Sequence, residues 1–256
     1  MNERIALGSE TRRVEVGSGV MLYDTSRAGN LTPSWFEVDY WRGRDALVGQ
    51  AGGRGTTWFA ATPDIGIALR HYRRGGFIAR LSEDRYLYLG DAKTRPMHEW
   101  RLTYQLHRAG LPVPAPLGAR YQRDGLTYRG DLITERIEDS RSVAQRLRDS
   151  SLPLSDWIAI GRCIRRFHDF GVCHADLNAH NILWRGDGEI FLIDFDRGSL
   201  RPRGMWCDAN LVRLRRSLLK VTAELPTGTF SETDWHSVLA GYWQGAGNVG
   251  PSAAAH

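Results

Sequence analysis

One short segment of the chain combines the residue types that phosphoryl transfer requires. Residues 171–198, GVCHADLNAHNILWRGDGEIFLIDFDRG, contain His174, Asp176, Asn181 and Asp194. Transfer of a phosphoryl group from ATP needs one carboxylate near the attacking hydroxyl and two oxygen ligands that hold Mg²⁺ against the phosphates. The two aspartates and the asparagine supply all three groups.

The sequence between Asn181 and Asp194 predicts a hairpin that would bring these two residues together. The apolar runs IL and EIFLI flank GDG at 186–188, which is a turn signal. Adjacent strands would therefore carry both residues to one metal site. We interpret His174 as a structural imidazole that hydrogen-bonds the backbone near Asp194, and not as a catalytic group.

The N-terminal part predicts strands followed by one helix. Residues 1–90 are rich in Gly, Thr, aromatic and β-branched residues, which indicates strands joined by turns. Pro96 suits the first turn of a helix, so we expect a helix of about 96–109. Glu99 lies three residues before Leu102 and projects toward the packing face, where a carboxylate needs a cationic partner.

After a predicted buried strand at 131–137, the pattern becomes mainly helical. We expect a lobe boundary near 138–141 and helices at 142–148 and 155–170, with Ser155 as the cap of the second helix. The order of elements is therefore strands, one helix, strands and then helices.

The composition is that of a soluble globular protein with an unusual choice of cations. The 256 residues are 42% hydrophobic and 25% charged, which excludes a disordered tail, a collagen-like repeat and a disulfide scaffold. The 34 basic residues outnumber the 29 acidic ones and comprise 32 Arg and only 2 Lys, Lys93 and Lys220. The three cysteines form no CxxC pair and are expected to be reduced, and no secretory signal or membrane-spanning run is predicted.

Three motifs resemble the lipopolysaccharide kinases of the protein-kinase-like superfamily, in particular the kinases of 3-deoxy-D-manno-octulosonic acid (Kdo). They are LRHYRRGG at 69–76, HADLNAHNIL at 174–183 and LIDFDRG at 192–198. The resemblance covers most of the chain in order. It implies a bilobal, protein-kinase-like α+β fold, with a strand-rich, nucleotide-binding lobe at 1–138 and a mainly helical, catalytic and acceptor-binding lobe at 139–256, and with ATP bound between them.

The resemblance also implies roles for the residues singled out above. Asp176 is the expected base, and Asn181 and Asp194 are the expected Mg²⁺ ligands. Glu99 is the expected helix carboxylate that pairs with a strand cation.

In place of the lysine that anchors phosphate in this superfamily, the chain has Arg70. The run IALR at 67–70 occupies the position of VAIK. The planar fork of an arginine can bind phosphate bidentately, so we assign the anchor to Arg70. Lys93 is the alternative, and we rank it lower because it lies just before the predicted helix and not in a strand.

The remaining nucleotide contacts implied by the resemblance rest on weaker signals. A glycine cluster before TTWF departs from GxGxxG, yet its backbone could still cradle phosphate. Adenine is expected to meet backbone groups from Glu135 to Ile137. The cradle would consist of Gly52, Gly53 and Gly55.

The resemblance implies phosphorylation of the 4-hydroxyl of a Kdo residue on lipid A precursor, with ATP and Mg²⁺, by a peripheral protein at the cytoplasmic side of the bacterial inner membrane. Asp196 in place of the glycine of DFG fits the lipopolysaccharide kinases. Only 62 residues follow Asp194, without an APE tripeptide, which favours a glycolipid over a protein acceptor. We expect an anionic membrane surface as a further partner, and neither a protein substrate nor a nucleic acid.

Three other functions remain open. A lipopolysaccharide heptose kinase would keep the fold and change the acceptor. A soluble kinase of the aminoglycoside phosphotransferase type would require an acidic C-terminal lobe, whereas residues 195–220 carry seven basic residues against two acidic ones. A basic nucleic-acid-binding module would bind DNA or RNA in a salt-sensitive manner without ATP turnover.

Two groups of basic residues each have two interpretations. Arginines at positions 70, 73, 74, 80 and 85 could line a site for phosphorylated lipid or form a solvated strand edge. Residues 210–221 predict a helix that either lies on an anionic membrane or, as we favour, packs on the core. Its apolar side would consist of Leu211, Leu214, Leu218, Leu219 and Val221.

Overall fold

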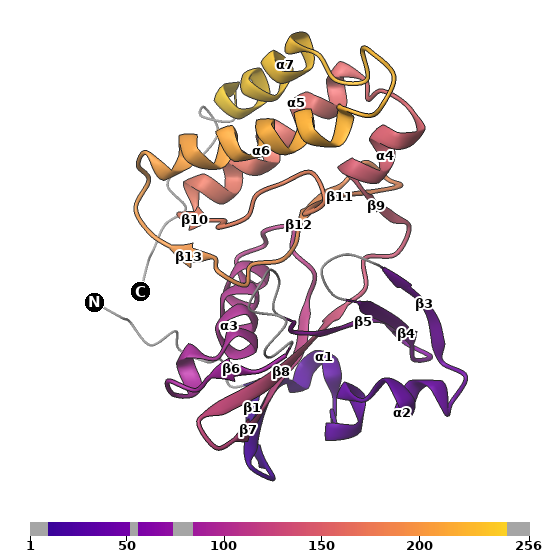
Figure 1. Cartoon of the computed structure of the whole chain (residues 1–256), viewed down its shortest axis with the longest axis vertical. Helices are drawn as coiled ribbons and strands as arrows, with labels where there is room; N and C mark the ends of the chain where they lie inside the picture. Colours follow the sequence, from indigo (N-terminus) through magenta and orange to yellow (C-terminus); the bar gives the residue numbers. More distant parts are fainter. Residues whose placement is uncertain (1–9, 52–55, 74–83, 245–256) are drawn as a thin grey trace. The chain divides into compact units, whose positions relative to one another are not determined.

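The computed structural model describes residues 10–51, 56–73 and 84–244, and the chain divides into two compact units, Met1–Glu138 and Asp139–His256 (Figure 1). The first unit is rich in strands and the second is mainly helical. The fold class is therefore α+β, as predicted. That the first unit binds the nucleotide and the second binds the acceptor stays a proposal.

The first unit is built on one antiparallel sheet. Glycines with positive φ, such as Gly17 at 57° and Gly125 at 59°, form turns between consecutive strands, because they lack the Cβ that makes this conformation costly. The strands are β1 (Thr11–Val16), β2 (Gly19–Asp24), β3 (Leu47–Ala51), β4 (Thr57–Ala61), β5 (Gly66–His71), β6 (Tyr86–Leu87), β7 (Pro116–Asp124) and β8 (Thr127–Glu135), and the helical segments are α1 (Thr25–Ala28), η1 (Pro33–Phe36), α2 (Val38–Arg42), η3 (Asp91–Lys93) and α3 (Arg95–Arg108).

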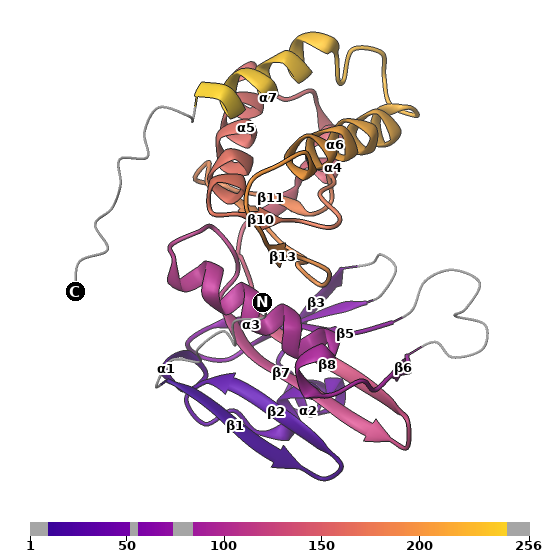
Figure 2. The same ribbon diagram turned by 90° about the vertical axis from the view of Figure 1, so that its left-hand side faces the viewer.

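The sheet has the strand order β1-β2-β7-β8-β5-β4-β3, with β6 paired to β8, and both of its faces are covered. Side chains alternate between the faces along each strand. On β2, Leu22 belongs to the cluster that contains Trp100 of α3, whereas Tyr23 belongs to the opposite cluster with Phe36 and Trp41. Figure 2 shows α3 lying across β7 and β8. This packing fixes α3 against β7 and against β8, the strand next to β5.

The region expected to hold only strands and turns also contains short helices. Asp24 caps α1 by accepting a hydrogen bond of 2.9 Å from the Ser26 N–H, and Pro33 begins η1. Trp41 of α2 is buried. These helices are too short to show a helical period in the sequence, which is why the prediction missed them.

The second unit is organised around four helices and several short strands. Ser142 forms a capping box at the start of α4, since its hydroxyl accepts from the Gln145 N–H at 3.1 Å. The predicted cap Ser155 is wrong, because α5 already begins after Pro153 and Ser155 lies in its first turn. The helices are α4 (Val143–Asp149), α5 (Leu154–Asp169), α6 (Trp206–Thr222) and α7 (Glu232–Gln244), and the strands are β9 (Ser140–Ser142), β10 (Val172–Cys173), β11 (Ile182–Arg185), β12 (Ile190–Leu192) and β13 (Ser199–Leu200).

Glycines allow α5 and α7 to pack closely. A Cβ on Gly161 would lie 2.0 Å from the Val238 carbonyl oxygen, and one on Gly241 would lie 2.0 Å from the Ile158 carbonyl oxygen. Neither backbone oxygen can move without displacing its helix, so only glycine fits at these two positions. The close packing fixes α5, which also contacts β10 and β12.

The helix α6 packs on the core, as favoured. Leu211, Leu214 and Leu218 are buried, but Leu219 is 45% exposed and does not belong to the packing face. Arg215, which interrupts the leucines, forms an ion pair with Glu232 of α7. All three cysteines are free, and no helix within the described ranges is long and apolar enough to cross a membrane.

The contacts of His71, at the end of β5, should make the free energy of unfolding depend on pH. Its Nδ1 lies 2.7 Å from Asp131 and its Nε2 lies 3.4 Å from Asp84. The hydrogen bond to Asp131 raises the pKa of His71 above its usual value of 6.5, so its stabilising contribution is complete below that value and is lost as the pH rises through the raised pKa. We expect the difference in unfolding free energy between the wild type and His71→Gln, measured with urea, to shrink as the pH rises above about 6.5. A difference that stays constant over this range would contradict the assignment.

Candidate active site

In the first unit, Arg70 of β5 forms an ion pair with Glu99 of α3, as predicted. Glu99 is only 3% exposed, and the hydroxyl of Tyr72 donates a second hydrogen bond to the same carboxylate oxygen. Arg70 also donates to the Tyr72 hydroxyl at 3.1 Å. Burial, with the charge of Glu99, raises the pKa of Tyr72 well above 10, so its hydroxyl remains a donor. The buried carboxylate is thus satisfied from two sides.

The geometry of this pair favours Arg70 over Lys93 as the phosphate anchor. Arg70 lies on an interior strand of the sheet, and 24% of its side chain is exposed. Lys93 is exposed in the short turn η3 that precedes α3. A cation held in one orientation by a buried carboxylate is suited to hold a phosphate, and a mobile surface lysine is not. The role itself stays a prediction.

In the second unit, His174 connects the two loops that the sequence analysis assigned to catalysis and to metal binding. We call residues 174–181 the catalytic loop and residues 194–196 the metal loop. The imidazole Nε2 lies 2.9 Å from the Ile193 carbonyl oxygen, and Nδ1 accepts from the Asp176 N–H at 3.2 Å. Nε2 must therefore carry the proton, and His174 has the structural role that we predicted. Burial lowers its pKa, which keeps the ring in the neutral form that these two bonds require.

Further hydrogen bonds within the catalytic loop fix its backbone conformation. Asn178 accepts from the His180 N–H at 2.8 Å and from the Asn181 N–H at 3.2 Å, which closes a tight turn. The Asn181 amide donates to the Asp176 carbonyl oxygen at 2.9 Å. Asp176 is held by its backbone, while its carboxylate is 64% exposed. A carboxylate in that state can approach a hydroxyl group of an acceptor.

The predicted hairpin between Asn181 and Asp194 is confirmed. Strands β11 and β12 pair antiparallel, with Ile182 opposite Leu192, and the Ile193 N–H donates to the Asn181 carbonyl oxygen at 3.1 Å. Asn181 immediately precedes β11. One residue, Ile193, separates Asp194 from the end of β12. The hairpin therefore places both residues at its open end.

Asp194 has a backbone conformation that is unusual for its type. Its φ is 68°, in the left-handed region where non-glycine residues are uncommon. Phe195 beside it is 1% exposed, with its ring centroid 5.9 Å from that of Phe167 on α5 and 4.9 Å from that of His174. The buried phenylalanine therefore anchors this loop, and Asp194 beside it has the left-handed backbone conformation.

The donor set at the open end of this hairpin fits Mg²⁺. Because the Asn181 nitrogen donates to a carbonyl oxygen, its Oδ1 is the atom left for a ligand, and Asp194 supplies a carboxylate. Mg²⁺ is commonly held by one or two such oxygens, with substrate phosphates and water completing the octahedron. In the part of the chain that the structure describes, no group of three His, Cys, Asp or Glu residues is arranged for a metal ion.

The helix α6 contacts the catalytic loop through residues that the sequence analysis did not single out. Asn210, which is buried, accepts from the His174 N–H at 3.2 Å, and Ser217 accepts from the Ala179 N–H at 3.1 Å. Between them, Arg213 lies 3.6 Å from the Asp176 carboxylate. The signal in the sequence is a set of polar residues at a spacing of three and four, which puts them on one side of a helix.

Other predicted nucleotide contacts are not brought into a site. Gly52, Gly53 and Gly55 lie outside the described residues. The Glu135 N–H donates to the Ala115 carbonyl oxygen at 2.8 Å, and the Glu135 side chain pairs with Arg27 at 2.9 Å. Adenine contact through the segment from Glu135 to Ile137 would therefore need backbone atoms other than this N–H, and it stays a prediction.

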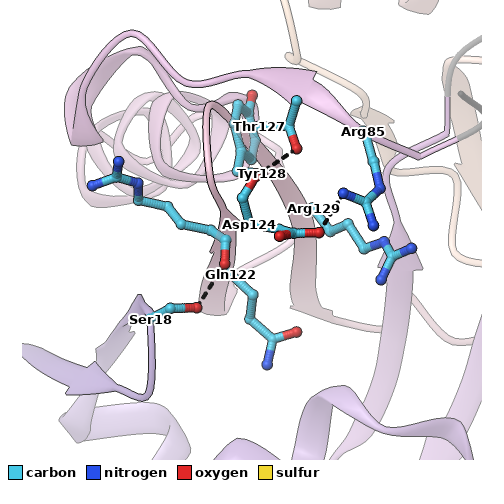
Figure 3. A pocket seen from close by; sticks show the side chains of 8 residues that line it. Ser18, Arg85, Gln122, Asp124, Thr127, Tyr128 and Arg129 are labelled. Carbon is cyan, nitrogen blue, oxygen red and sulfur yellow. Dashed lines mark hydrogen bonds and ion pairs between the residues drawn. The ribbon is translucent and has the colours of Figure 1, made fainter.

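Two of the other described residues, His168 and Arg85, lie apart from the three motifs. His168 is buried, with its Nδ1 2.8 Å from the Tyr242 hydroxyl, and burial lowers its pKa to about 4, as expected of a neutral core histidine. Arg85 pairs with Asp124 beside a polar hollow of about 240 Å³ at the β7–β8 turn (Figure 3). No residue of the three motifs lines this hollow. Arg70 points instead to Glu99, and positions 74 and 80 lie outside the described residues.

The strand-rich and helical units, with their Arg–Glu pair, catalytic loop and metal loop, define a protein-kinase-like phosphotransferase. The family model described as "Lipopolysaccharide kinase (Kdo/WaaP) family" matches residues 38–242. The chain belongs to this family, and it is therefore an enzyme that transfers phosphate to an alcohol group.

Relatives from several bacteria are named 3-deoxy-D-manno-octulosonic acid kinase. The protein of Xanthomonas axonopodis pv. citri is 47% identical over 206 residues, which cover 80% of this chain and 82% of the relative. That of Mannheimia succiniciproducens is 42% identical over 215 residues, covering 81% and 89%. That of Haemophilus influenzae is 38% identical over 231 residues, covering 87% and 95%.

Proposed function

We propose that the protein transfers the γ-phosphate of ATP to the 4-hydroxyl of a Kdo residue on lipid A precursor, in the assembly of lipopolysaccharide. The observation that carries this proposal is the fixed catalytic loop, with an exposed Asp176 carboxylate, in a chain whose relatives are named as kinases of this sugar acid. A heptose kinase would use the same groups and remains the alternative.

In this proposal, each group of the site has one task. Asp176 accepts the proton of the sugar hydroxyl as the oxygen attacks phosphorus, and the hydrogen bonds of His174 and Asn181 keep Asp176 in place. Arg70, oriented by Glu99, holds the phosphates of the nucleotide. Asn181 and Asp194 would hold Mg²⁺, which when bound neutralises charge on the transferred phosphoryl group.

A comparison of acceptors tests the proposed substrate. Purified protein with ATP and Mg²⁺ should consume ATP in the presence of Kdo-bearing lipid A precursor, and should do so much more slowly with a heptose-bearing core oligosaccharide or an aminoglycoside. A free sugar without an acidic group serves as the negative control. Faster turnover with the heptose-bearing acceptor would replace the proposed function by its alternative.

We further propose that a groove between α6 and α7 contacts the anionic membrane in which such an acceptor resides. The groove has a volume of about 430 Å³ and is lined by apolar and basic side chains, with Asp208 as its one acidic member. Val212 is 55% exposed and Trp243 is 57% exposed, so both present apolar surface to solvent. Arg216 lies beside them, as does Arg215, whose charge is offset by its ion pair with Glu232. An anionic bilayer would accommodate both the exposed apolar side chains and the basic residues. Tryptophan favours the membrane interface, and each basic residue near an anionic surface adds about 1 kcal/mol of attraction.

Replacement of Val212 and Trp243 by serine should lower the affinity for vesicles. We expect the fraction that sediments with vesicles containing anionic lipid to fall several-fold, because both side chains would insert apolar area into the interface. The matched control is Leu126→Ser, which removes a 78% exposed leucine from the β7–β8 turn of the other unit. Equal sedimentation of the variant and the control would contradict the assignment of this surface.

A further inference from the structure

One side of α6 contacts the catalytic loop at three successive positions. Asn210, Arg213 and Ser217 are three and four residues apart, so they project from the same side of the helix. They contact His174, Asp176 and Ala179 of the loop, in that order.

Arg213 differs from Asn210 and Ser217 because its contact with the loop contributes little to the stability of the fold. Asn210 and Ser217 each accept from a backbone N–H of the loop, which is a structural role. Arg213 instead faces the Asp176 carboxylate at 3.6 Å, a distance longer than a direct hydrogen bond. Both side chains are about half exposed or more, at 47% and 64%. An ion pair of this kind contributes little to stability, so the fold does not explain the position of Arg213.

The proposed acceptor explains the position of Arg213 beside Asp176. Kdo is a sugar acid, and its carboxylate is negative at neutral pH. A second negative charge near Asp176 would be repelled by the base that must accept the hydroxyl proton. An arginine beside the base offsets this repulsion, and its planar fork matches the geometry of a carboxylate.

We propose that Arg213 binds the carboxylate of the sugar acid and thereby holds the reacting hydroxyl against Asp176. The inference rests on the proposed function, because it takes its substrate class from there. It adds a residue that determines acceptor specificity: an acceptor with an acidic group is favoured over a neutral one of the same shape. Arg213 forms no bond to the reacting atoms, and its effect is on the binding of the acceptor.

A comparison of two acceptors with three proteins tests this role. The acceptors are the Kdo-bearing lipid A precursor and the same compound with the Kdo carboxylate reduced to an alcohol. The proteins are the wild type, Arg213→Ala and Arg162→Ala, the last of which removes an exposed arginine from α5 of the same unit. Steady-state rates give KM and kcat for each acceptor, and KM for ATP is measured in parallel.

The wild type and Arg162→Ala should prefer the natural acceptor over the reduced one by about tenfold in KM, the effect of one charge-assisted hydrogen bond. Arg213→Ala should lose this preference, with an unchanged KM for ATP, and Arg213→Lys should restore part of it. A preference that survives in Arg213→Ala would overturn the inference, and so would a rise in the KM for ATP alone, which would assign Arg213 to the nucleotide. If the wild type phosphorylates neither acceptor, the proposed function fails instead.

Discussion

Asp176→Asn should lower kcat by about 10²- to 10⁴-fold and leave ATP binding intact. Asparagine keeps the size of the side chain, and the backbone bonds of Asp176 to His174 and Asn181 do not involve the carboxylate. The loop should therefore stay in place while the group that accepts the hydroxyl proton is lost, and general-base catalysis typically contributes this factor. Steady-state turnover gives kcat, and displacement of a fluorescent nucleotide gives the affinity for ATP.

The control for this variant is Asp187→Asn, the same chemical change in the turn between β11 and β12. Asp187 is 55% exposed and pairs with Arg185 at 2.7 Å, away from the catalytic loop. Its replacement should leave kcat unchanged. If Asp176→Asn retained most of the wild-type turnover, Asp176 could not be the base.

Arg70→Ala should raise the KM for ATP and also destabilise the first unit. The substitution leaves the buried Glu99 carboxylate with Tyr72 but without a cation, and the loss of one partner of a buried ion pair costs on the order of 3 kcal/mol. Arg70→Lys keeps the charge and the fold, so it separates the two effects. We expect Arg70→Lys to unfold near the wild-type temperature and still to bind ATP less tightly, because an ammonium group cannot hold phosphate as a planar fork does.

Lys93→Ala serves as the comparison for both Arg70 variants. Lys93 is exposed, and its removal should change neither the melting temperature nor the KM for ATP. A raised KM for ATP in Lys93→Ala, together with a normal KM in Arg70→Lys, would transfer the anchor to Lys93.

The sequence predicted those parts of the site that depend on short-range patterns. The turn signal GDG between two apolar runs predicted the β11–β12 hairpin, and helical spacing placed Glu99 on the buried side of α3. The period of 3.6 residues fixes the direction of the Glu99 side chain. Its partner Arg70 was implied by the resemblance to the kinase family, in which IALR takes the place of VAIK.

Contacts between distant segments were not predictable in the same way. Asn210 and Ser217 lie in a helix that the sequence analysis described only by its leucines and its basic residues, and only the folded chain shows that they accept hydrogen bonds from the catalytic loop. Leu219 was grouped with the buried leucines because its type suggested it, yet the helix turns it toward solvent. The start of α5 was misplaced because a serine is the usual cap, whereas this helix begins after Pro153.

The identity of the acceptor is the central claim, and mass spectrometry of the reaction product tests it most directly. The protein is incubated with ATP, Mg²⁺ and Kdo-bearing lipid A precursor, and the product is fragmented to locate any added phosphate. We predict one phosphate on the Kdo residue, at its 4-hydroxyl, and at least about a hundredfold slower formation of this product when Asp176→Asn replaces the wild type. An unmodified acceptor, or a phosphate on the lipid A part in place of the Kdo residue, would contradict the claim.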